Sequence, residues 1–453
     1  MSEQKATMVY GAGISGKGAA EVLAHRGQRV FLYNDNSCKI ENELQCLLES
    51  LGGGLVIGQE GFRKMLGQSG LLVLSPGVPT DNENVTWAIA QGVEVISEVE
   101  LGYRFYGGHM AAITGTNGKT TTTTLVGEMF KKLPVPSAVG GNIGMALSKE
   151  VENLPKEGWL AAELSSFQLE KVVSFCPDIA AVLNLTPDHL ERHHTMEAYG
   201  EAKQNIFKQQ GPEQITLLNY DDPIVRQWAS HTKGQVCFFS RKVVLDQGIF
   251  MQNGNFVIKW KDREYVVCNI KEVQLFGGHN EENILAAIGC GYFAGVAVAD
   301  MAEVLRNFQS IEHRLEYVTT IKGVPYYNDS KATNTDSTIK ALEAFPEGHL
   351  VLLAGGHDKL TPLEDMMNLV QEKVDVLILL GEAKERFHQA ALKAGVKNIL
   401  LAESFEDAVN KAYAVAVKPQ AVVLSPACSS YDMFKNYPER GRKFKALVKA
   451  LEK

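Results

Sequence analysis

Two glycines, a lysine and a threonine hydroxyl lie together in residues 115–120, which read Gly-Thr-Asn-Gly-Lys-Thr. The N–H groups of a glycine turn attract phosphate oxygens, a lysine adds positive charge for the β and γ phosphates, and a hydroxyl can bind Mg²⁺. The usual phosphate-loop pattern has another glycine at the position of Ile113, so this loop is a shortened variant. These residues predict a nucleoside triphosphate site; the alternative is an ordinary strand–helix turn with a solvated lysine.

The elements that would position this loop are visible on both sides of it. The apolar residues 110–113 predict a strand before the loop, and the threonine-rich run 120–124 predicts the start of a helix after it. A helix that begins at the loop would direct the positive end of its dipole at the phosphates.

A second glycine motif lies near the N-terminus, where residues 11–16 read Gly-Ala-Gly-Ile-Ser-Gly after a predicted strand. Asp35 ends the next predicted strand, as in the dinucleotide-binding fingerprint. This motif alone indicates an NAD-dependent dehydrogenase, but two sites for two different nucleotides is the simpler account of both loops. Ser75, Pro76 and Gly77 follow another strand end and would line the same crevice, unless they form only a tight turn.

Three further residues of the middle region could carry chemistry. Glu163 ends an apolar strand beside the phosphate loop and is well placed to hold Mg²⁺, unless it is a solvated charge. His189 follows another strand, at the sheet edge where open α/β folds bind ligands, whereas His193 and His194 are interpreted as solvated. Lys203 is, by itself, an ordinary surface lysine of a helix.

Composition limits the class of protein. The 453 residues suggest three domains, and the net charge of −8 argues against non-specific nucleic-acid binding. Seven dispersed cysteines without a CxxC pair indicate reduced thiols in a cytoplasmic protein. No apolar run reaches the roughly 18 residues of a membrane span, and no signal peptide is visible.

Short apolar runs alternate with helical patterns along most of the chain, which predicts an α/β protein with largely parallel sheets. The predicted strands fall into three groups: 8–10, 29–33 and 71–74; 111–113, 160–163, 179–184 and 215–218; and 349–354, 375–380 and 421–424. Residues 236–269 alternate apolar and polar side chains around turns, which predicts an antiparallel hairpin insertion. The predicted domains are 1–108, 109–311 and 312–453.

The ordered set of motifs resembles the Mur ligases, and the segment 163–170 most resembles the members that add D-glutamate. The resemblance spans the whole chain and is carried by residues 115–121, 140–144, 163–170, 184–190, 278–283, 312–314, 328–334 and 425–436. It implies an N-terminal Rossmann-like domain for a UDP-sugar, a central P-loop ATPase domain with the small insertion, and a C-terminal Rossmann-like domain for an amino acid.

The activity that the resemblance implies is ATP-driven amide ligation in peptidoglycan synthesis, with two Mg²⁺ ions as cofactors. The implied partners are UDP-N-acetylmuramoyl-L-alanine and D-glutamate, joined through an acyl phosphate by a monomer in the cytoplasm. Another Mur-type ligase stays open as an alternative, although the alanine-adding member would carry histidine at Asn117. A P-loop switch that only signals would not need the third domain.

The resemblance also assigns residues to roles. The implied catalytic residues are Lys119, His189, Lys203 and Lys331. ATP would be bound by Gly115, Thr116, Asn117, Gly118, Lys119, Thr120, Thr121, Asn280, Asn283, Arg314 and Asp329. The UDP-sugar would be bound by Ser15, Asp35, Ser75, Pro76, Gly77, Asn142 and Ser165. D-Glutamate would be bound by Thr333, Lys359, Ser430, Tyr431 and Tyr437, and Mg²⁺ by Thr120, Glu163, His189 and a carbamylated Lys203. His357 and Tyr437 depart from the family pattern in the D-glutamate pocket.

Overall fold

The computed structural model describes residues 5–275, 277–308, 312–345 and 347–451, which form two compact units. The described residues of 5–185, 189–272 and 282–306 make the first unit, and those of 186–188, 273–281 and 307–451 make the second. The predicted domain boundary at 108 falls inside the first unit, between two sheets. The predicted boundary at 311 lies outside the described residues. The three-domain division therefore stays a prediction.

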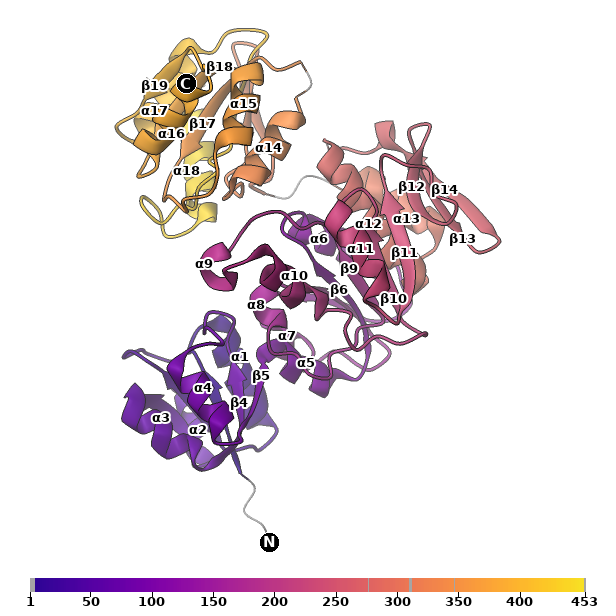
Figure 1. Cartoon of the computed structure of the whole chain (residues 1–453), viewed down its shortest axis with the longest axis vertical. Helices are drawn as coiled ribbons and strands as arrows, with labels where there is room; N and C mark the ends of the chain where they lie inside the picture. The colour runs from indigo at the N-terminus through magenta and orange to yellow at the C-terminus, as the bar shows by residue number, and fades with distance from the viewer. Residues whose placement is uncertain (1–4, 276, 309–311, 346, 452–453) are drawn as a thin grey trace. The chain divides into compact units, whose positions relative to one another are not determined.

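The first unit begins with a five-stranded parallel sheet (Figure 1). Its strands are β1 (Ala6–Tyr10), β2 (Val30–Asn34), β3 (Gly54–Ile57), β4 (Ser69–Leu74) and β5 (Glu94–Ser97). Its helices are α1 (Ile14–His25), α2 (Asn42–Ser50), α3 (Gly58–Leu66), α4 (Glu83–Ala90) and α5 (Glu98–Tyr106). The strand order is β3-β2-β1-β4-β5, the order of a Rossmann-type half.

Successive side chains of these strands point to opposite faces, so the sheet has two cores. Val9 and Leu32 pack against α1 and α2, whereas Met8 and Tyr33 pack against α3 and α4. The Rossmann-like sheet that the sequence predicts is confirmed, and β3 and β5 are strands that it did not predict.

The second sheet of this unit has nine strands. They are β6 (His109–Thr114), β7 (Ser137–Gly141), β8 (Trp159–Glu163), β9 (Ile179–Val182), β10 (Ile215–Asn219), β11 (Gln235–Ser240), β12 (Gly248–Gln252), β13 (Asn255–Trp260) and β14 (Arg263–Asn269). The order is β14-β13-β12-β11-β10-β9-β6-β8-β7, and β6 therefore lies between β8 and β9. This order brings the ends of three predicted functional strands to one edge.

Helices of very different length accompany the second sheet. They are α6 (Lys119–Phe130), α7 (Leu147–Glu150), α8 (Ser166–Leu169), α9 (Leu190–His193), α10 (Met196–Gln204), α11 (Pro223–Gln227), α12 (Gly278–Ala294) and α13 (Val298–Asn307). Helices α7, α8 and α9 have only four residues each, too few to be stable without tertiary contacts.

The prediction of an antiparallel hairpin insertion over 236–269 is partly wrong. Strand β11 pairs in parallel with β10, and β12 pairs in parallel with β11. The antiparallel part is limited to β12, β13 and β14, which extend the central sheet. Alternating polarity indicates a strand with one exposed face, and it does not reveal the direction of the partner strand.

The second unit has a six-stranded sheet made of β15 (Glu316–Ile321), β16 (Val324–Asn328), β17 (Leu350–Gly355), β18 (Val374–Leu380), β19 (Ile399–Leu401) and β20 (Ala421–Leu424). Its order is β15-β16-β20-β17-β18-β19, with only the β15–β16 pair antiparallel. Its helices are α14 (Thr335–Glu343), α15 (Glu364–Lys373), α16 (Lys384–Lys393), α17 (Phe405–Val415) and α18 (Tyr437–Ala450).

Helices cover both faces of this sheet (Figure 1). Leu350 and Leu352 pack toward α14, α15 and α16, whereas Val351 and Leu353 pack toward α17 and α18. The Rossmann-like character predicted for this region is confirmed. In the described part of the chain, no helix combines the length and the hydropathy that crossing a bilayer requires.

Candidate active site

The phosphate loop lies where the sequence predicts it, between the end of β6 and the start of α6. Gly115 has φ 155° and Gly118 has φ 85°, both in the region that glycine tolerates best. The N–H of Thr116 donates to the carbonyl oxygen of Asn184 (3.1 Å), and the N–H of Asn117 donates to the Asn184 side-chain oxygen (2.8 Å). Asn184, just after β9, therefore fixes the shape of the loop.

Two lysines converge on this loop. Lys119 Nζ donates to the carbonyl oxygens of Gly115 (2.9 Å) and Thr116 (2.8 Å). Lys203 Nζ, from α10, also donates to Gly115 (2.8 Å) and lies 4.6 Å from the ring centre of Tyr199. Lys203 is only 1% exposed, so the reading of it as an ordinary surface lysine is wrong. Helical periodicity places Lys203 and Tyr199 on one face of α10, turned toward the loop.

The first turn of α6 carries the two remaining loop residues of the predicted ATP site. Thr120 and Thr121 are both buried. Asn283, in α12, also reaches this region: a side chain added at Gly118 would lie 2.1 Å from Asn283 Oδ1. The Thr122 hydroxyl lies 3.4 Å from the same oxygen. Asn283 is therefore next to the phosphate loop, as predicted for an ATP-binding residue.

Glu163 ends β8, where it pairs with Ile113 of β6, two residues before the loop. Its side chain is buried, and Oε1 accepts a hydrogen bond from Asn142 Nδ2 (2.9 Å). Among the residues that the structure describes, no donor reaches Oε2. A buried carboxylate oxygen without a donor suits a cation, because leaving it unpaired costs free energy. The structure thus joins Asn142 to Glu163, two residues predicted for different ligands.

His189 occupies the N-terminal cap of α9, with a left-handed φ of 55°. Its ring lies edge-on to Phe167 (4.9 Å between ring centres), and Nδ1 is 3.5 Å from Glu191. His193 is buried and bonds through Nε2 to the Ser166 hydroxyl (2.9 Å), so its reading as a solvated residue is wrong. Burial lowers the pKa of His193, although the nearby Glu170 carboxylate acts in the opposite direction.

Among the described residues, protein side chains alone do not form a chelating cluster around the phosphate loop. Within the described residues, no group of three or more His, Cys, Asp and Glu side chains could hold a metal ion. A Mg²⁺ site here would combine few protein ligands with phosphate oxygens and water, as is usual for this ion.

The N-terminal glycine loop is held by residues predicted to bind the UDP-sugar. The Ser75 hydroxyl donates to the carbonyl oxygen of Gly11 (2.8 Å), and a side chain at Gly16 would lie 1.8 Å from that oxygen. Pro76 and Gly77 continue the turn after β4, and Gly77 is exposed. Ser15 is partly exposed in the first turn of α1.

Asp35 is exposed just beyond β2 and accepts hydrogen bonds from the hydroxyls of Tyr10 (2.8 Å) and Tyr33 (2.9 Å). Burial, and then the Asp35 carboxylate, raise the pKa of Tyr10 to about 12, so this hydroxyl stays protonated and donating. Ser165 caps α8 in a capping box with Gln168. The sequence did not predict these supporting roles.

In the second unit, Asp329 follows β16 and is buried. Its carboxylate accepts from the Ser425 hydroxyl (2.8 Å) and the Leu315 N–H (3.1 Å). Burial raises the pKa of Asp329 to about 7, against the lowering effect of these bonds and of Arg314 and Arg440. Asp329 therefore packs in the interior of the unit, where it supports the loop that carries Arg314.

Lys331, predicted as a catalytic residue, and Tyr437, predicted for D-glutamate, meet directly. Lys331 Nζ donates to the Tyr437 hydroxyl (2.9 Å) and lies 4.8 Å from its ring centre. Other residues of this unit that are predicted to bind ATP or D-glutamate are spread over it: Asn280 lies in the first turn of α12, Thr333 before α14, and Lys359 after β17, while Ser430 is buried and Tyr431 is 72% exposed after β20.

A phosphate loop at a strand–helix junction, beside a buried carboxylate that ends the neighbouring strand, defines an α/β enzyme of the P-loop type. Residues 113–291 match the Mur ligase middle domain, and residues 313–428 match the glutamate ligase domain of Mur ligases. The chain belongs to the Mur ligase family. This membership decides against the alternative of a dehydrogenase.

Named relatives match over nearly their whole length. The chain is 42% identical to UDP-N-acetylmuramoylalanine–D-glutamate ligase of Lachnoclostridium phytofermentans, over 99% of this chain and 98% of that protein. It is 44% identical to the ligase of the same name from Desulfitobacterium hafniense, with the same coverage. Among solved structures, a pseudomurein peptide ligase type C from Methanothermus fervidus has the same fold, with a TM-score of 0.63, 17% identity and coverage of 98% of this chain and 100% of that one.

Proposed function

We propose that this protein is an ATP-dependent ligase that joins D-glutamate to UDP-N-acetylmuramoyl-L-alanine in peptidoglycan synthesis. The convergence of Lys119 and Lys203 on Gly115, beside the buried carboxylate of Glu163, is the structural observation that carries ATP-dependent chemistry. The choice of D-glutamate is supported by the names of the relatives, which match the chain from end to end.

The reaction has two steps. The carboxylate of the L-alanine attacks the γ-phosphate of ATP to give an acyl phosphate and ADP. The amine of D-glutamate then attacks the acyl carbon, loses a proton, and expels phosphate to leave the amide. Because a carboxylate and a triphosphate repel each other, the first step needs positive charge around the phosphoryl group.

The chain supplies part of this charge through the phosphate loop. Lys119 would leave the loop carbonyl oxygens that it bonds now and pair with phosphate oxygens. The N–H groups at the start of α6 would bind the phosphates, since they lack partners within the helix. Gly118 must stay small there, because Asn283 lies against it.

Mg²⁺ would be held by Thr120, Glu163, His189 and Lys203, in two sites, and would supply further positive charge to the transferring phosphoryl group. Among the described residues no donor reaches Glu163 Oε2, which supports the assignment of Glu163 as a ligand. Carbamylation of Lys203 stays a prediction: it would turn a buried ammonium into a carboxylate-like ligand. A ¹³C carbamate resonance in protein prepared with labelled bicarbonate, absent from K203R, is the expected result, and equal spectra would contradict it.

Substrate dependence of phosphate release tests the proposed function. Release from ATP should require both UDP-N-acetylmuramoyl-L-alanine and D-glutamate, and the product should gain the mass of one glutamate. Release with L-lysine or diaminopimelate in place of D-glutamate, at an equal rate, would assign the protein to another Mur-type ligase. The assignments of Arg314, Lys331, Lys359 and Ser430 to ligands are part of this proposal.

A further inference from the structure

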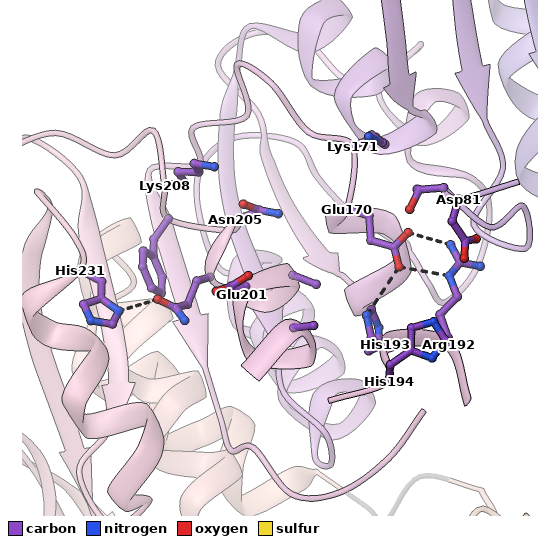
Figure 2. A pocket seen from close by; sticks show the side chains of 15 residues that line it. Asp81, Glu170, Lys171, Arg192, His193, His194, Glu201, Asn205, Lys208 and His231 are labelled. Atoms are coloured by element: carbon purple, nitrogen blue, oxygen red, sulfur yellow. Dashed lines mark hydrogen bonds and ion pairs between the residues drawn. The ribbon is translucent and has the colours of Figure 1, made fainter. Parts of the chain in front are cut away.

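Arg192 and Glu170 lie in the wall of a cavity of about 660 Å³ in the first unit. Figure 2 shows the two side chains facing each other, with His193 beside them. Both side chains are largely buried, with exposed fractions of 14% for Arg192 and 11% for Glu170. Neither residue is among the site residues that the sequence predicted.

The Arg192 guanidinium makes three hydrogen bonds. Nε donates to Glu170 Oε1 (3.2 Å), Nη2 donates to Glu170 Oε2 (2.8 Å), and Nη2 also donates to the carbonyl oxygen of Val78 (3.0 Å). Its carbon Cζ lies 4.7 Å from the ring centre of Phe167. A planar fork that bonds a carboxylate through two nitrogens fixes direction as well as distance, which a lysine cannot do.

These contacts join three segments that carry predicted site residues. Glu170 is the C-terminal cap of α8, which Ser165 caps at its other end. The N–H of Arg192 donates to the carbonyl oxygen of His189 (3.1 Å). Val78 closes the turn of Ser75, since its N–H donates to the Ser75 carbonyl oxygen (3.0 Å).

The segments need such support, because neither short helix is stable by itself. Helices α8 and α9 have four residues each, below the length at which a helix is stable in water. His189 and His194, on either side of α9, both have positive φ angles, of 55° and 65°. Non-glycine residues keep such conformations only when neighbouring contacts hold them.

We propose that Arg192 and Glu170 are positioning residues that hold His189 and Ser165 in register with the Ser75–Val78 turn. The inference rests on the proposed function, in which these segments bind the UDP-sugar and metal. It predicts a role in sugar-nucleotide binding for two residues that do not themselves touch the substrate.

Substitution R192K, which keeps the charge and loses the fork, is the main test. We expect KM for UDP-N-acetylmuramoyl-L-alanine to rise about tenfold and kcat to fall, because small misplacements of binding groups lower both binding and rate. KM for ATP should change less than about twofold. E170Q, which weakens the same pair from the other side, should shift the same constants. In the pair E170A and R192A, the double variant should lose less than the sum of the two single losses, because each single variant already removes the Arg192–Glu170 pair.

The matched control is R306K, which alters the more exposed Arg306–Glu272 pair of the same unit and should leave both KM values unchanged. A melting temperature that falls in R192K while KM for the UDP-sugar stays constant would show a merely structural role and overturn the inference. Additive losses in the double variant would do so too. Calorimetric titration with the UDP-sugar measures binding without ligation. A wild-type protein that binds the UDP-sugar and does not join D-glutamate to it would contradict the proposed function. The affinity of R192K for the UDP-sugar would still decide the role of the Arg192–Glu170 pair.

Discussion

The ammonium groups of Lys119 and Lys203 both donate a hydrogen bond to the carbonyl oxygen of Gly115, at 2.9 and 2.8 Å. The two lysines are far apart in sequence, and Lys203 reaches the loop from α10. Two positive charges thus share one neutral oxygen at the centre of the phosphate loop. Anionic phosphate oxygens are far better partners for an ammonium group than a peptide carbonyl, so ATP binding would draw Lys119 away from Gly115.

Replacing Lys119 with glutamine should abolish most of the activity without unfolding the protein. The side chain keeps a donor for the loop carbonyl oxygens and loses the charge that a transferring phosphoryl group requires. We expect kcat/KM for ATP to fall by about 10² to 10³, measured by phosphate release. Far-UV circular dichroism and the melting temperature should match wild type; an active K119Q would exclude Lys119 from the reaction.

Replacing Glu163 with glutamine should have opposite effects on stability and on metal use. The amide oxygen can still accept from Asn142, while the buried negative charge is removed, whose Oε2 meets no donor among the described residues. The metal-free variant should therefore melt at a higher temperature than wild type in the presence of a chelator. The Mg²⁺ concentration that gives half-maximal activity should be at least about tenfold higher than for wild type, as measured by titrating the ion. An unchanged Mg²⁺ dependence would show that Glu163 is not a ligand.

Replacing Gly118 with alanine should damage the phosphate loop. The backbone has φ 85°, and the new carbon would lie 2.1 Å from Asn283 Oδ1. We expect a loss of about 1–3 kcal/mol in the free energy of unfolding and loss of ATP binding by calorimetry. Gly67 is the matched control: it has φ −60°, and an added carbon there meets nothing closer than 3.7 Å. G67A should therefore bind ATP normally, and normal binding by G118A would contradict the role given to this glycine.

The pH dependence of stability should carry a contribution from Asp329. Its pKa is raised to about 7 in the folded protein, above the ordinary value of 3.8. Between these values the folded chain holds a proton that the unfolded chain has lost. This contribution to stability is therefore complete below pH 4 and is lost as the pH rises to about 7. The slope approaches about 1.4 kcal/mol per pH unit for one proton, and D329N should remove it.

Hydrogen exchange in the β16 and β20 segments is the suitable measurement for Asp329. All four tryptophans (87, 159, 228 and 260) lie in the first unit, so their fluorescence does not report on the second. The difference in exchange protection between wild type and D329N should decrease from pH 5 to pH 7. Parallel profiles for the two proteins would mean that Asp329 is ionised throughout.

The sequence anticipated the features that depend on local patterns. Strands such as β6 and β17 are short runs of apolar residues, the pattern of a strand buried inside a sheet. The glycines of the two loops occupy conformations that glycine tolerates best. The predictions from sequence were wrong for residues whose neighbours in space are distant in the chain. His193 and Lys203 lie on polar helical segments and look solvated, yet both are buried because α8 and the phosphate loop cover them. The direction of β11 was misjudged for the same reason, since strand pairing is a property of two segments.

By itself, then, the sequence determined the α/β class, the phosphate loop and the family, because these are written in short segments whose residue types and spacing are constrained by backbone geometry and ligand chemistry. Only the tertiary structure decided that Lys119 and Lys203 share the Gly115 oxygen, that one oxygen of Glu163 meets no donor in the described part of the chain, and that Arg192 joins Glu170 to Val78. These relationships depend on strand order, burial and the angle at which helices meet the sheet, and such long-range geometry leaves no local pattern in the chain.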